Sequence, residues 1–269
     1  MAYIKIQIEQ DAILKGGLLL GEILEDLGNM VQPGMTTLEI DLEAERRILA
    51  VGGIPAFKGY APSGHSPFPG TICACINDEI VHGIPSKHVL IEGQILSIDI
   101  GMQYPANSGL GQGGNGFFTD TAITVPVGEI NSQARQLISV TKKSLDKAIA
   151  VATNGTSVAE IGRVIERYIE PQGYGIVRDL VGHGVGHEVH EEPAVPNYYE
   201  SYLEKTILQP GVVIAIEPMI TVGDYRTDVL DDGWTIVTDD GSLSAHFEHT
   251  IIITAEGEPV IATKRPSEK

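Results

Sequence analysis

Apolar side chains recur at helical spacing in two pairs of segments, one pair in each half of the chain. The first segment covers about residues 10–30, where leucine and isoleucine return with each helical turn. The second starts at Thr36 and Glu39, which have capping-box spacing, and stops at Gly52. We therefore predict two consecutive helices joined by a short turn.

The same succession returns after residue 130. A helical pattern covers about residues 131–153, and Ser157 with Glu160 repeats the capping-box spacing at the start of the next helix. Two short motifs, VHGIP at 81–85 and VHEEP at 189–193, fall in corresponding places after the two helix pairs. These repeated patterns and motifs favour an architecture of two related halves.

Each half continues into two apolar, β-rich segments that predict strands. They cover residues 95–101, 117–127, 212–220 and 246–254. Each contains one buried-looking acid: Asp99, Asp120, Glu217 and Glu248. Because no Ser/Pro-rich linker separates the halves, we predict a single α+β domain over residues 1–269, with related halves at about 10–127 and 131–254.

Composition excludes several classes of protein. Acidic residues outnumber basic ones 36 to 18, and a net charge of −18 argues against binding nucleic acid through bulk positive charge. No stretch approaches the ~20 apolar residues of a membrane span, and the N-terminus lacks a signal-peptide pattern. Cys73 and Cys75 are the only two cysteines, and one residue separates them on a predicted strand. We predict that they form neither a disulfide nor a zinc site. We expect a soluble cytoplasmic protein without membrane or nucleic-acid partners.

The four strand acids are costly to bury without a partner. For any one of them, a salt bridge or hydrogen bond explains the burial as well as a metal ion does. Four acids at corresponding strand positions, with few basic residues nearby in the sequence, favour metal binding.

Histidines cluster in VGHGVGHEVHEEP at 181–193. His183 and His187 have the His-x-x-x-His spacing of a zinc-binding helix, but the glutamate of that motif is absent and the interspersed glycines disfavour a helix. We predict a loop or short strand that carries imidazoles, His183 and His190 among them, into the site. His187 is expected to have a structural role outside the ligand set. His249 is expected to face away from the glutamate that precedes it.

The order Asp, Asp, His, Glu, Glu resembles the ligand set of the pita-bread metallopeptidases. The five residues are Asp99, Asp120, His183, Glu217 and Glu248, within SIDIG, FTDTA, GHGVGH, IEP and FEHT. VHGIP, VHEEPAVPNY and DGWTIVTDDGSLSAHFEHT are similar to motifs of the type I methionine aminopeptidases of family M24. The resemblance extends from EQDAILKGG to FEHTIIIT and implies a pita-bread fold, a curved antiparallel sheet covered by helices.

The resemblance implies a dinuclear metal site. Asp99 would chelate one ion, and Asp120 with Glu248 would bridge both. His183 and Glu217 would complete the second ion. Four carboxylates balance two divalent ions, and a water between the ions would become a hydroxide near neutral pH that attacks the first peptide carbonyl. Glu217 would shuttle the proton.

The resemblance also implies a role in substrate binding for two further histidines. His82 and His190 would lie beside the scissile bond, and it stays open which contacts nitrogen and which contacts oxygen. Mixed carboxylate and imidazole ligands suit Mn, Fe, Co or Zn. The implied activity is removal of the initiator methionine from nascent proteins and peptides, and family precedent predicts a monomer.

Selectivity for methionine requires an apolar pocket. The family builds it from an aromatic-rich segment before the first HGIP and from the Trp of DGWT, and these positions here hold Tyr60, Phe68, Cys73 and Trp234. Phe57 and Val189 stand at two further lining positions, where the family commonly has a cysteine and an aromatic residue, and core packing explains them equally well. Since one methylene is worth only ~1–3 kcal/mol in such a pocket, the reaction is predicted more directly than strict methionine selectivity. Segment 61–70, longer than usual in the family, is expected to alter the pocket rim.

Two other functions share parts of this pattern. Xaa-Pro aminopeptidases and prolidases have the same five ligands, and GHEVHE is similar to their motifs, whereas DGWTIVTDDGSLSAHFEHT favours a methionine aminopeptidase. A pita-bread binding module without catalysis is disfavoured because all five ligands and both site histidines are present.

The stretch SGLGQGGNG at 108–116 contains the Gly-x-Gly-x-x-Gly spacing of dinucleotide-binding turns. Such a turn opens a helix, but a predicted strand follows here, so a nucleotide site is disfavoured. The resemblance makes residues 104–116 an extended hairpin tip between two ligand-bearing strands. We expect a mobile surface lobe that contacts a partner or the ribosome, or only links the strands.

Overall fold

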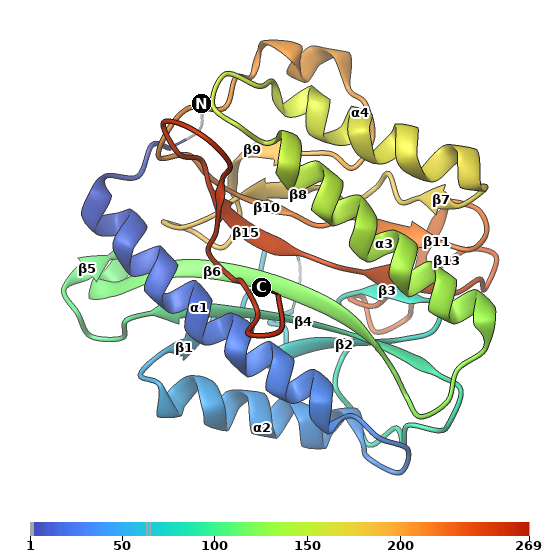
Figure 1. Ribbon diagram of the computed structural model, residues 1–269. Coiled ribbons are helices and arrows are strands. Elements are labelled where there is room, and N and C mark those ends of the chain that lie inside the picture. The colour runs from blue at the N-terminus through green and yellow to red at the C-terminus, as the bar shows by residue number, and fades with distance from the viewer. Residues whose placement is uncertain (1–2, 63, 65, 269) are drawn as a thin grey trace.

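The structure is a computed structural model that describes residues 3–62, 64 and 66–268. Within these residues the α-helices are α1 (Gln7–Met30), α2 (Thr37–Ala50), α3 (Ser132–Val151) and α4 (Val158–Ile169). Short 3₁₀ helices lie at Gln112–Gly114, Glu170–Gln172 and Ser201–Lys205. The two predicted helix pairs are confirmed. Figure 1 shows α1 and α2 on one side of the molecule and α3 and α4 on the other, each pair packed mainly against strands of its own half.

The starts of α2 and α4 differ although both sequences have capping-box spacing. At α2, the Glu39 amide donates to Thr36 Oγ1 at 3.2 Å and the Thr36 amide donates to Glu39 Oε2 at 2.7 Å, which confirms the predicted box. At α4, Ser157 makes no side-chain cap hydrogen bond, so the second predicted box is wrong. The Glu160 carboxylate instead lies 3.2 Å from Nε of Arg163, one turn along the helix.

The first half forms a sheet around two long antiparallel strands. Its strands are β1 (Ile54–Pro55), β2 (Ile72–Ile76), β4 (Ile95–Tyr104), β5 (Leu110–Gly111) and β6 (Asn115–Pro126). β4 pairs with β6 along its entire length, β1 and β2 also pair with β4, and β5 is added to β6 in parallel. The two strands predicted for this half are confirmed.

The register of β4 and β6 places two predicted metal ligands together. Asp99 is opposite Ala122, and Asp120 is opposite Gly101. Because opposed residues share a face and side chains alternate along each strand, both carboxylates project from the same side of the sheet.

The second half is divided among smaller sheets. Its strands are β7 (Gly175–Ile176), β8 (Gly182–Gly184), β9 (Glu191–Val195), β10 (Val213–Ile216), β11 (Met219–Thr221), β12 (Thr227–Val229), β13 (Ile236–Thr238), β14 (Ser244–His246), β15 (His249–Ile252) and β16 (Val260–Ile261). One sheet has the order β16-β15-β10-β8-β9, and another has the order β14-β11-β7. A third, β12-β13-β3, includes β3 (Glu79–Val81) and so joins the two halves.

The last two predicted strands are each interrupted, so the expectation of continuous strands is wrong there. Glu217 and Pro218 separate β10 from β11, and proline has no amide to continue a ladder. Phe247 and Glu248 separate β14 from β15. At this second break the Glu248 amide donates to the Ala122 carbonyl of β6 at 3.0 Å, which turns the chain toward the first half.

We call the junction between β6 and residues 246–250 the seam. Threonine hydroxyls reach across it. Thr121 Oγ1 donates to the Glu248 carbonyl at 2.8 Å, and Thr250 Oγ1 donates to the Asp120 carbonyl at 2.8 Å. The seam thereby brings the strand that carries Asp120 beside Glu248 of the second half.

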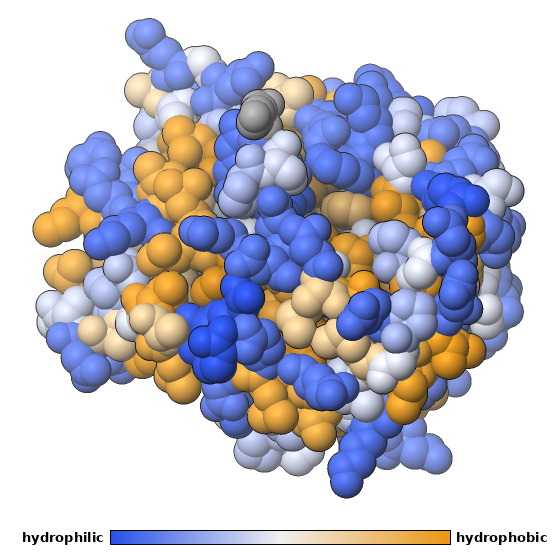
Figure 2. All heavy atoms as spheres, turned by 60° about the horizontal axis from the view of Figure 1, so that its bottom comes forward, coloured by the Kyte–Doolittle hydropathy of each residue, from blue (hydrophilic) through white to orange (hydrophobic). Residues whose placement is uncertain are grey.

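A large hydrophobic core lies between the helices and the sheets and contains side chains from both halves. Leu24 of α1, Ile100 of β4, Leu145 of α3 and Ile214 of β10 are all buried within it. On the outside, Figure 2 shows a mosaic in which hydrophilic side chains separate smaller hydrophobic groups. Among the described residues, no helix combines the length and apolar character needed to cross a membrane.

The glycine-rich stretch between β4 and β6 curls back on itself. The Gly109 amide donates to the Gly114 carbonyl at 3.0 Å, and the Asn107 amide donates to Asn115 Oδ1 at 3.2 Å. β6 follows it directly, so the stretch does not open an α-helix as a dinucleotide-binding turn would. The extended connection is confirmed, and its mobility stays a prediction.

Candidate metal centre and adjoining pocket

All five predicted metal ligands line one cavity of about 240 Å³. The elements that carry them are β4 for Asp99, β6 for Asp120, β8 for His183, and the two strand interruptions for Glu217 and Glu248. Both halves of the chain therefore contribute side chains to the same site.

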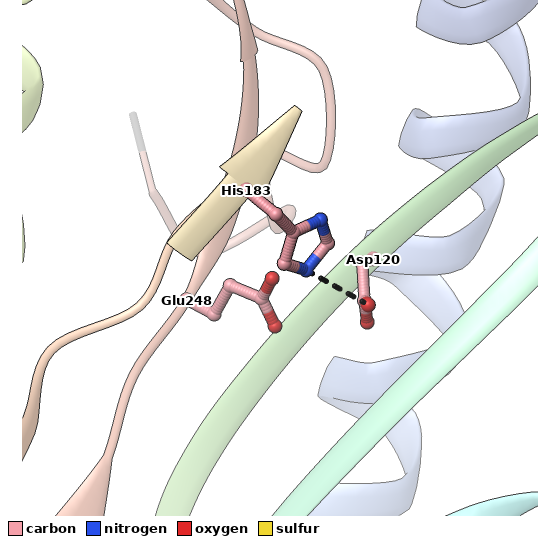
Figure 3. A group of neighbouring side chains, drawn as sticks. All are labelled: Asp120, His183 and Glu248. Carbon is pink, nitrogen blue, oxygen red and sulfur yellow. Dashed lines mark ion pairs between the residues drawn. The ribbon is translucent and has the colours of Figure 1, made fainter. Parts of the chain in front are cut away.

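Asp120, His183 and Glu248 form a compact group and point toward one another from different elements (Figure 3). One candidate ligand atom from each lies within 4.8 Å of the others. Nε2 of His183 is 3.9 Å from Oδ2 of Asp120 and 3.6 Å from Oε1 of Glu217. Nδ1 of His183 is 2.9 Å from the Gly184 carbonyl, and a proton donated there leaves Nε2 free to bind a metal ion.

Burial leaves the carboxylates short of partners. Oδ1 of Asp99, Oδ1 of Asp120 and Oε1 of Glu248 are buried and have no hydrogen-bond partner among the described residues. Burial raises the pKa of Asp99 to about 7. Burial, together with the neighbouring carboxylates, also raises the pKa of Asp120, Glu217 and Glu248. Buried oxygens with these properties, joined by one imidazole, fit a divalent metal ion.

Burial also keeps two imidazoles of the site neutral. It lowers the pKa of His183 to about 3, and the nearby His190 acts in the same direction. Burial likewise lowers the pKa of His190. The two rings lie edge to face with their centroids 4.4 Å apart. The neutral imidazole is the form of His183 that binds a metal ion.

An apolar wall adjoins the metal ligands in the same cavity. It contains the predicted pocket residues Phe57, Tyr60, Phe68, Cys73 and Trp234. The rings of Phe68 and Trp234 lie edge to face, 5.2 Å apart. Nε1 of Trp234 donates to the Ser66 carbonyl at 3.2 Å, which fixes the orientation of the indole.

The structure places Phe57 and Val189 in different positions relative to the cavity. Phe57 lines the cavity, and a Cβ added to Gly101 would lie only 2.7 Å from Cε1 of Phe57. Val189 packs into the hydrophobic cluster around the pocket but is not one of the cavity's lining residues. Of the two interpretations from the sequence, a lining position fits Phe57 and core packing fits Val189.

Segment 61–70 contributes to the wall of the cavity at two positions. Pro62 and Phe68 line it. Residues 63 and 65 lie outside the described residues, and the expected change of the pocket rim stays a prediction.

His82 and His190 both line the cavity, and their place beside the scissile bond stays a prediction. Nδ1 of His190 is 3.1 Å from the hydroxyl of Tyr60. His82 has a φ of 58°, in the left-handed region that residues other than glycine rarely adopt, and its ring lies 5.9 Å from that of Trp234. Strained backbone of this kind is concentrated at functional sites.

Sequence reasoning missed several residues of the cavity. Leu180, Val181 and Met219 add apolar surface to it. His246 is also close, because its Nε2 lies 3.6 Å from Oε2 of Glu217 and its side chain is only 2% exposed. The available signal was the spacing of two positions between His246 and Glu248, which puts both on one face of an extended chain.

His187 and His249 lie outside the ligand group, as predicted. Nε2 of His187 is 3.0 Å from Oε1 of Glu9 on α1. His249 faces the opposite side of its strand, where Nδ1 is 3.0 Å from Oγ1 of Thr263.

Comparison with known proteins agrees with this geometry. Residues 11–255 match metallopeptidase family M24. The chain is 42% identical to the methionine aminopeptidase of Clostridium acetobutylicum, over 97% of this chain and 98% of that protein. A methionine aminopeptidase from Thermotoga maritima has a crystal structure with a TM-score of 0.88 and 37% identity, and the match covers 98% of this chain and 100% of that one.

The proline-specific alternative has weaker support. A prolidase from Pyrococcus horikoshii matches 97% of this chain and 63% of its own, with a TM-score of 0.74 and 23% identity, which shows a shared fold alone. The likeness to the methionine aminopeptidase structure confirms the predicted pita-bread fold. The chain belongs to metallopeptidase family M24 and, within that family, to the methionine aminopeptidases.

Proposed function

We propose that this protein hydrolyses the first peptide bond of peptides and proteins that begin with methionine, with the help of bound divalent metal ions. The observation that carries the proposal is one cavity lined both by a carboxylate–imidazole group suited to a metal ion and by an apolar wall. Its volume of about 240 Å³ is below the ~300–1,000 Å³ typical of pockets for drug-sized ligands, which suits a single N-terminal residue.

We infer that the site holds two ions. Asp99, Asp120, His183, Glu217 and Glu248 would hold them. Four carboxylates supply the negative charge that two divalent ions balance, and Mn, Fe, Co and Zn all suit these ligands. When bound, such ions lower the pKa of a water molecule and polarise the carbonyl of the peptide.

Glu217 is the residue to which we assign proton transfer. Its carboxylate lies 3.6 Å from Nε2 of His183 and 3.6 Å from Nε2 of His246. Burial raises its pKa, which favours a group that accepts a proton in one step and returns it in the next. The proton removed from the attacking water would thus reach the nitrogen of the departing peptide.

His82 and His190 are assigned to hold the scissile peptide group. Both line the cavity, and the Tyr60 hydroxyl beside Nδ1 of His190 fixes the orientation of that ring. A neutral imidazole either donates to the peptide carbonyl or accepts from the peptide amide, so either histidine can serve either atom.

The methionine side chain would occupy the apolar wall. Phe57, Tyr60, Phe68, Cys73 and Trp234 would contact it directly, and Val189 would act only through packing. Because an apolar pocket distinguishes side chains by ~1–3 kcal/mol per methylene, leucine should be accepted more slowly than methionine rather than excluded.

We further propose that nascent chains are among the substrates and that the tip between β4 and β6 contacts the ribosome. Residues 104–116 carry no charged side chain in a chain of net charge −18, so this segment does not repel nucleic-acid phosphates. Co-sedimentation with ribosomes of the wild type and of a variant lacking residues 108–114 tests this, and equal binding by both would contradict it.

One assay tests the proposed activity. Metal-depleted protein is given Mn, Fe, Co or Zn and then a Met-Ala-Ser, a Leu-Ala-Ser or an Ala-Pro-Ser peptide, and the released amino acid is measured. We expect methionine release with at least one metal and none with a chelator. Cleavage of Ala-Pro-Ser with Met-Ala-Ser left intact would favour a proline-specific peptidase instead.

A further inference from the structure

Residues 262–268 run along the side of the seam that faces away from the cavity. The Ala262 amide donates to the Thr250 carbonyl at 2.9 Å, and the Thr250 amide donates to Thr263 Oγ1 at 3.0 Å. Ala262 and Thr263 are fully buried. We call residues 262–268 the strap, because they cross the joined strands of the two halves.

Arg265 is the charged residue that the strap buries against the seam. Only 5% of the residue is exposed. Nη2 of its guanidinium donates to Oε1 of Glu268 at 2.9 Å and lies 3.0 Å from Nε2 of His249. Nη1 donates to the Ala122 carbonyl of β6 at 3.3 Å. A buried guanidinium is tolerated only when its donors are satisfied, so these contacts define one position for the side chain.

Arg265 and Glu248, a proposed metal ligand, contact the same two residues of β6. The same Ala122 carbonyl that accepts from Arg265 also accepts from the Glu248 amide at 3.0 Å. Thr121 Oγ1, 3.5 Å from Nη1 of Arg265, donates to the Glu248 carbonyl at 2.8 Å. Both backbone polar groups of Glu248 are therefore bonded to the residues of β6 that Arg265 contacts. Asp120 lies on β6 next to Thr121.

We propose that the strap supports the metal centre from outside and that Arg265 is its positioning residue. By binding β6 where Glu248 is anchored, it sets the spacing between the carboxylates of Asp120 and Glu248 on the opposite side of the seam. The role rests on the proposed metal site, which the strap does not touch.

Arg265 brings both a defined position and a positive charge to the side of the seam behind Glu248. Position and charge can be separated because lysine keeps the charge but lacks the planar fork of donors.

The experiment measures metal binding rather than activity. Co²⁺ is titrated into metal-depleted wild type, Arg265→Lys, Arg265→Met and a control, Lys142→Met, by calorimetry and by visible absorption of the bound ion. Lys142 is matched because it also pairs with Glu268, at 3.2 Å, but its side chain is 43% exposed. Thermal unfolding identifies the variants that are folded at the titration temperature.

We expect Arg265→Met to bind Co²⁺ about 10- to 100-fold more weakly than wild type, the loss typical of residues that support metal ligands. Arg265→Lys should show a smaller loss and an altered Co²⁺ spectrum, and Lys142→Met should bind as wild type does. Unchanged affinity and spectrum in folded Arg265→Met would overturn the proposal, and if that variant does not fold, the same result in Arg265→Lys would do so. Failure of wild type to bind Co²⁺ would instead overturn the proposed metal site.

Discussion

The two halves of the chain hold their proposed metal ligands in different ways. In the first half, Asp99 and Asp120 lie inside β4 and β6, which pair with each other along the whole of β4. In the second half, Glu217 and Glu248 lie at interruptions between short strands. A continuous backbone ladder positions the first two carboxylates, whereas separate contacts position the other two.

Polar side chains make those separate contacts. Nδ2 of Asn197 donates to the Glu217 carbonyl at 3.0 Å, and Thr121 Oγ1 donates to the Glu248 carbonyl at 2.8 Å. Each satisfies a backbone group that a continuous ladder would otherwise bond. A backbone ladder therefore positions the proposed ligands of the first half, while the geometry of the second half depends on a few side chains that single substitutions can remove.

Removal of a ligand should have the largest effect, whichever half supplies it. We expect Asp120→Ala and His183→Ala to bring methionine release below detection and to weaken metal binding, because both side chains belong to the same compact group. His88→Ala, which changes an exposed histidine, is the control. Unchanged activity in His183→Ala would rule out the proposed metal centre.

A matched pair of substitutions tests the difference between the halves directly. Asn197→Ala removes a fully buried side chain and leaves the Glu217 carbonyl without its donor, which should cost about 1–3 kcal/mol of unfolding free energy and lower kcat about 10-fold or more. Ser97→Ala removes the 2.8 Å hydrogen bond to Thr124 near Asp99, but the ladder stays, so kcat should hardly change. Urea unfolding and steady-state kinetics measure both. Equal losses of kcat would show that the halves do not differ.

The pH dependence of the metal-free protein should be a smaller effect. Burial raises the pKa of Asp99 from 3.8 to about 7, so Asp99 binds more protons in the folded state than in the unfolded state between about pH 4 and about pH 7. The contribution of Asp99 to the free energy of unfolding should therefore fall as the pH rises through this window, and Asp99→Asn should remove that contribution. Bound metal requires ionised carboxylates and should abolish the effect of Asp99. Urea unfolding of metal-free wild type and Asp99→Asn across the window checks this, and equal pH slopes for the two proteins would contradict it.

Deletion of residues 108–114 should have the smallest effect. The ends of the deleted segment are close, since the Asn107 amide donates to Asn115 Oδ1 at 3.2 Å, and the β4–β6 ladder does not require the tip. We expect wild-type metal affinity and peptide hydrolysis, with a slightly lower melting temperature. Loss of metal binding would show that the tip is integral to the site.

Local sequence predicts the first half well because its ligands lie in regular strands. Asp99 and Asp120 each lie within an apolar β-rich segment, and in the structure each segment forms one continuous strand. The second half depends more on distant contacts. Pro218 is a local signal for the interruption between β10 and β11. The interruption at Glu248 has no such signal, because it occurs where the Glu248 amide donates to the carbonyl of Ala122, a residue distant in the sequence.

The start of α4 and the surroundings of the site also could not be predicted from local sequence. Ser157 and Glu160 have the spacing of a capping box, yet Arg163 one turn away pairs with the glutamate. The burial of His246 beside Glu217 and of Arg265 against the seam follows from how the sheets meet, which no local pattern specifies. The family resemblance supplied the full ligand order, while the residues supporting those ligands became visible only in the structure.

The most direct test of a metal site shared by both halves is anomalous X-ray diffraction from crystals grown with Mn²⁺ or Co²⁺. A metal site should give an anomalous peak bounded by Asp120, His183 and Glu248, with Asp99 and Glu217 completing its surroundings. Absence of a peak there, at metal concentrations that support methionine release, would contradict the account.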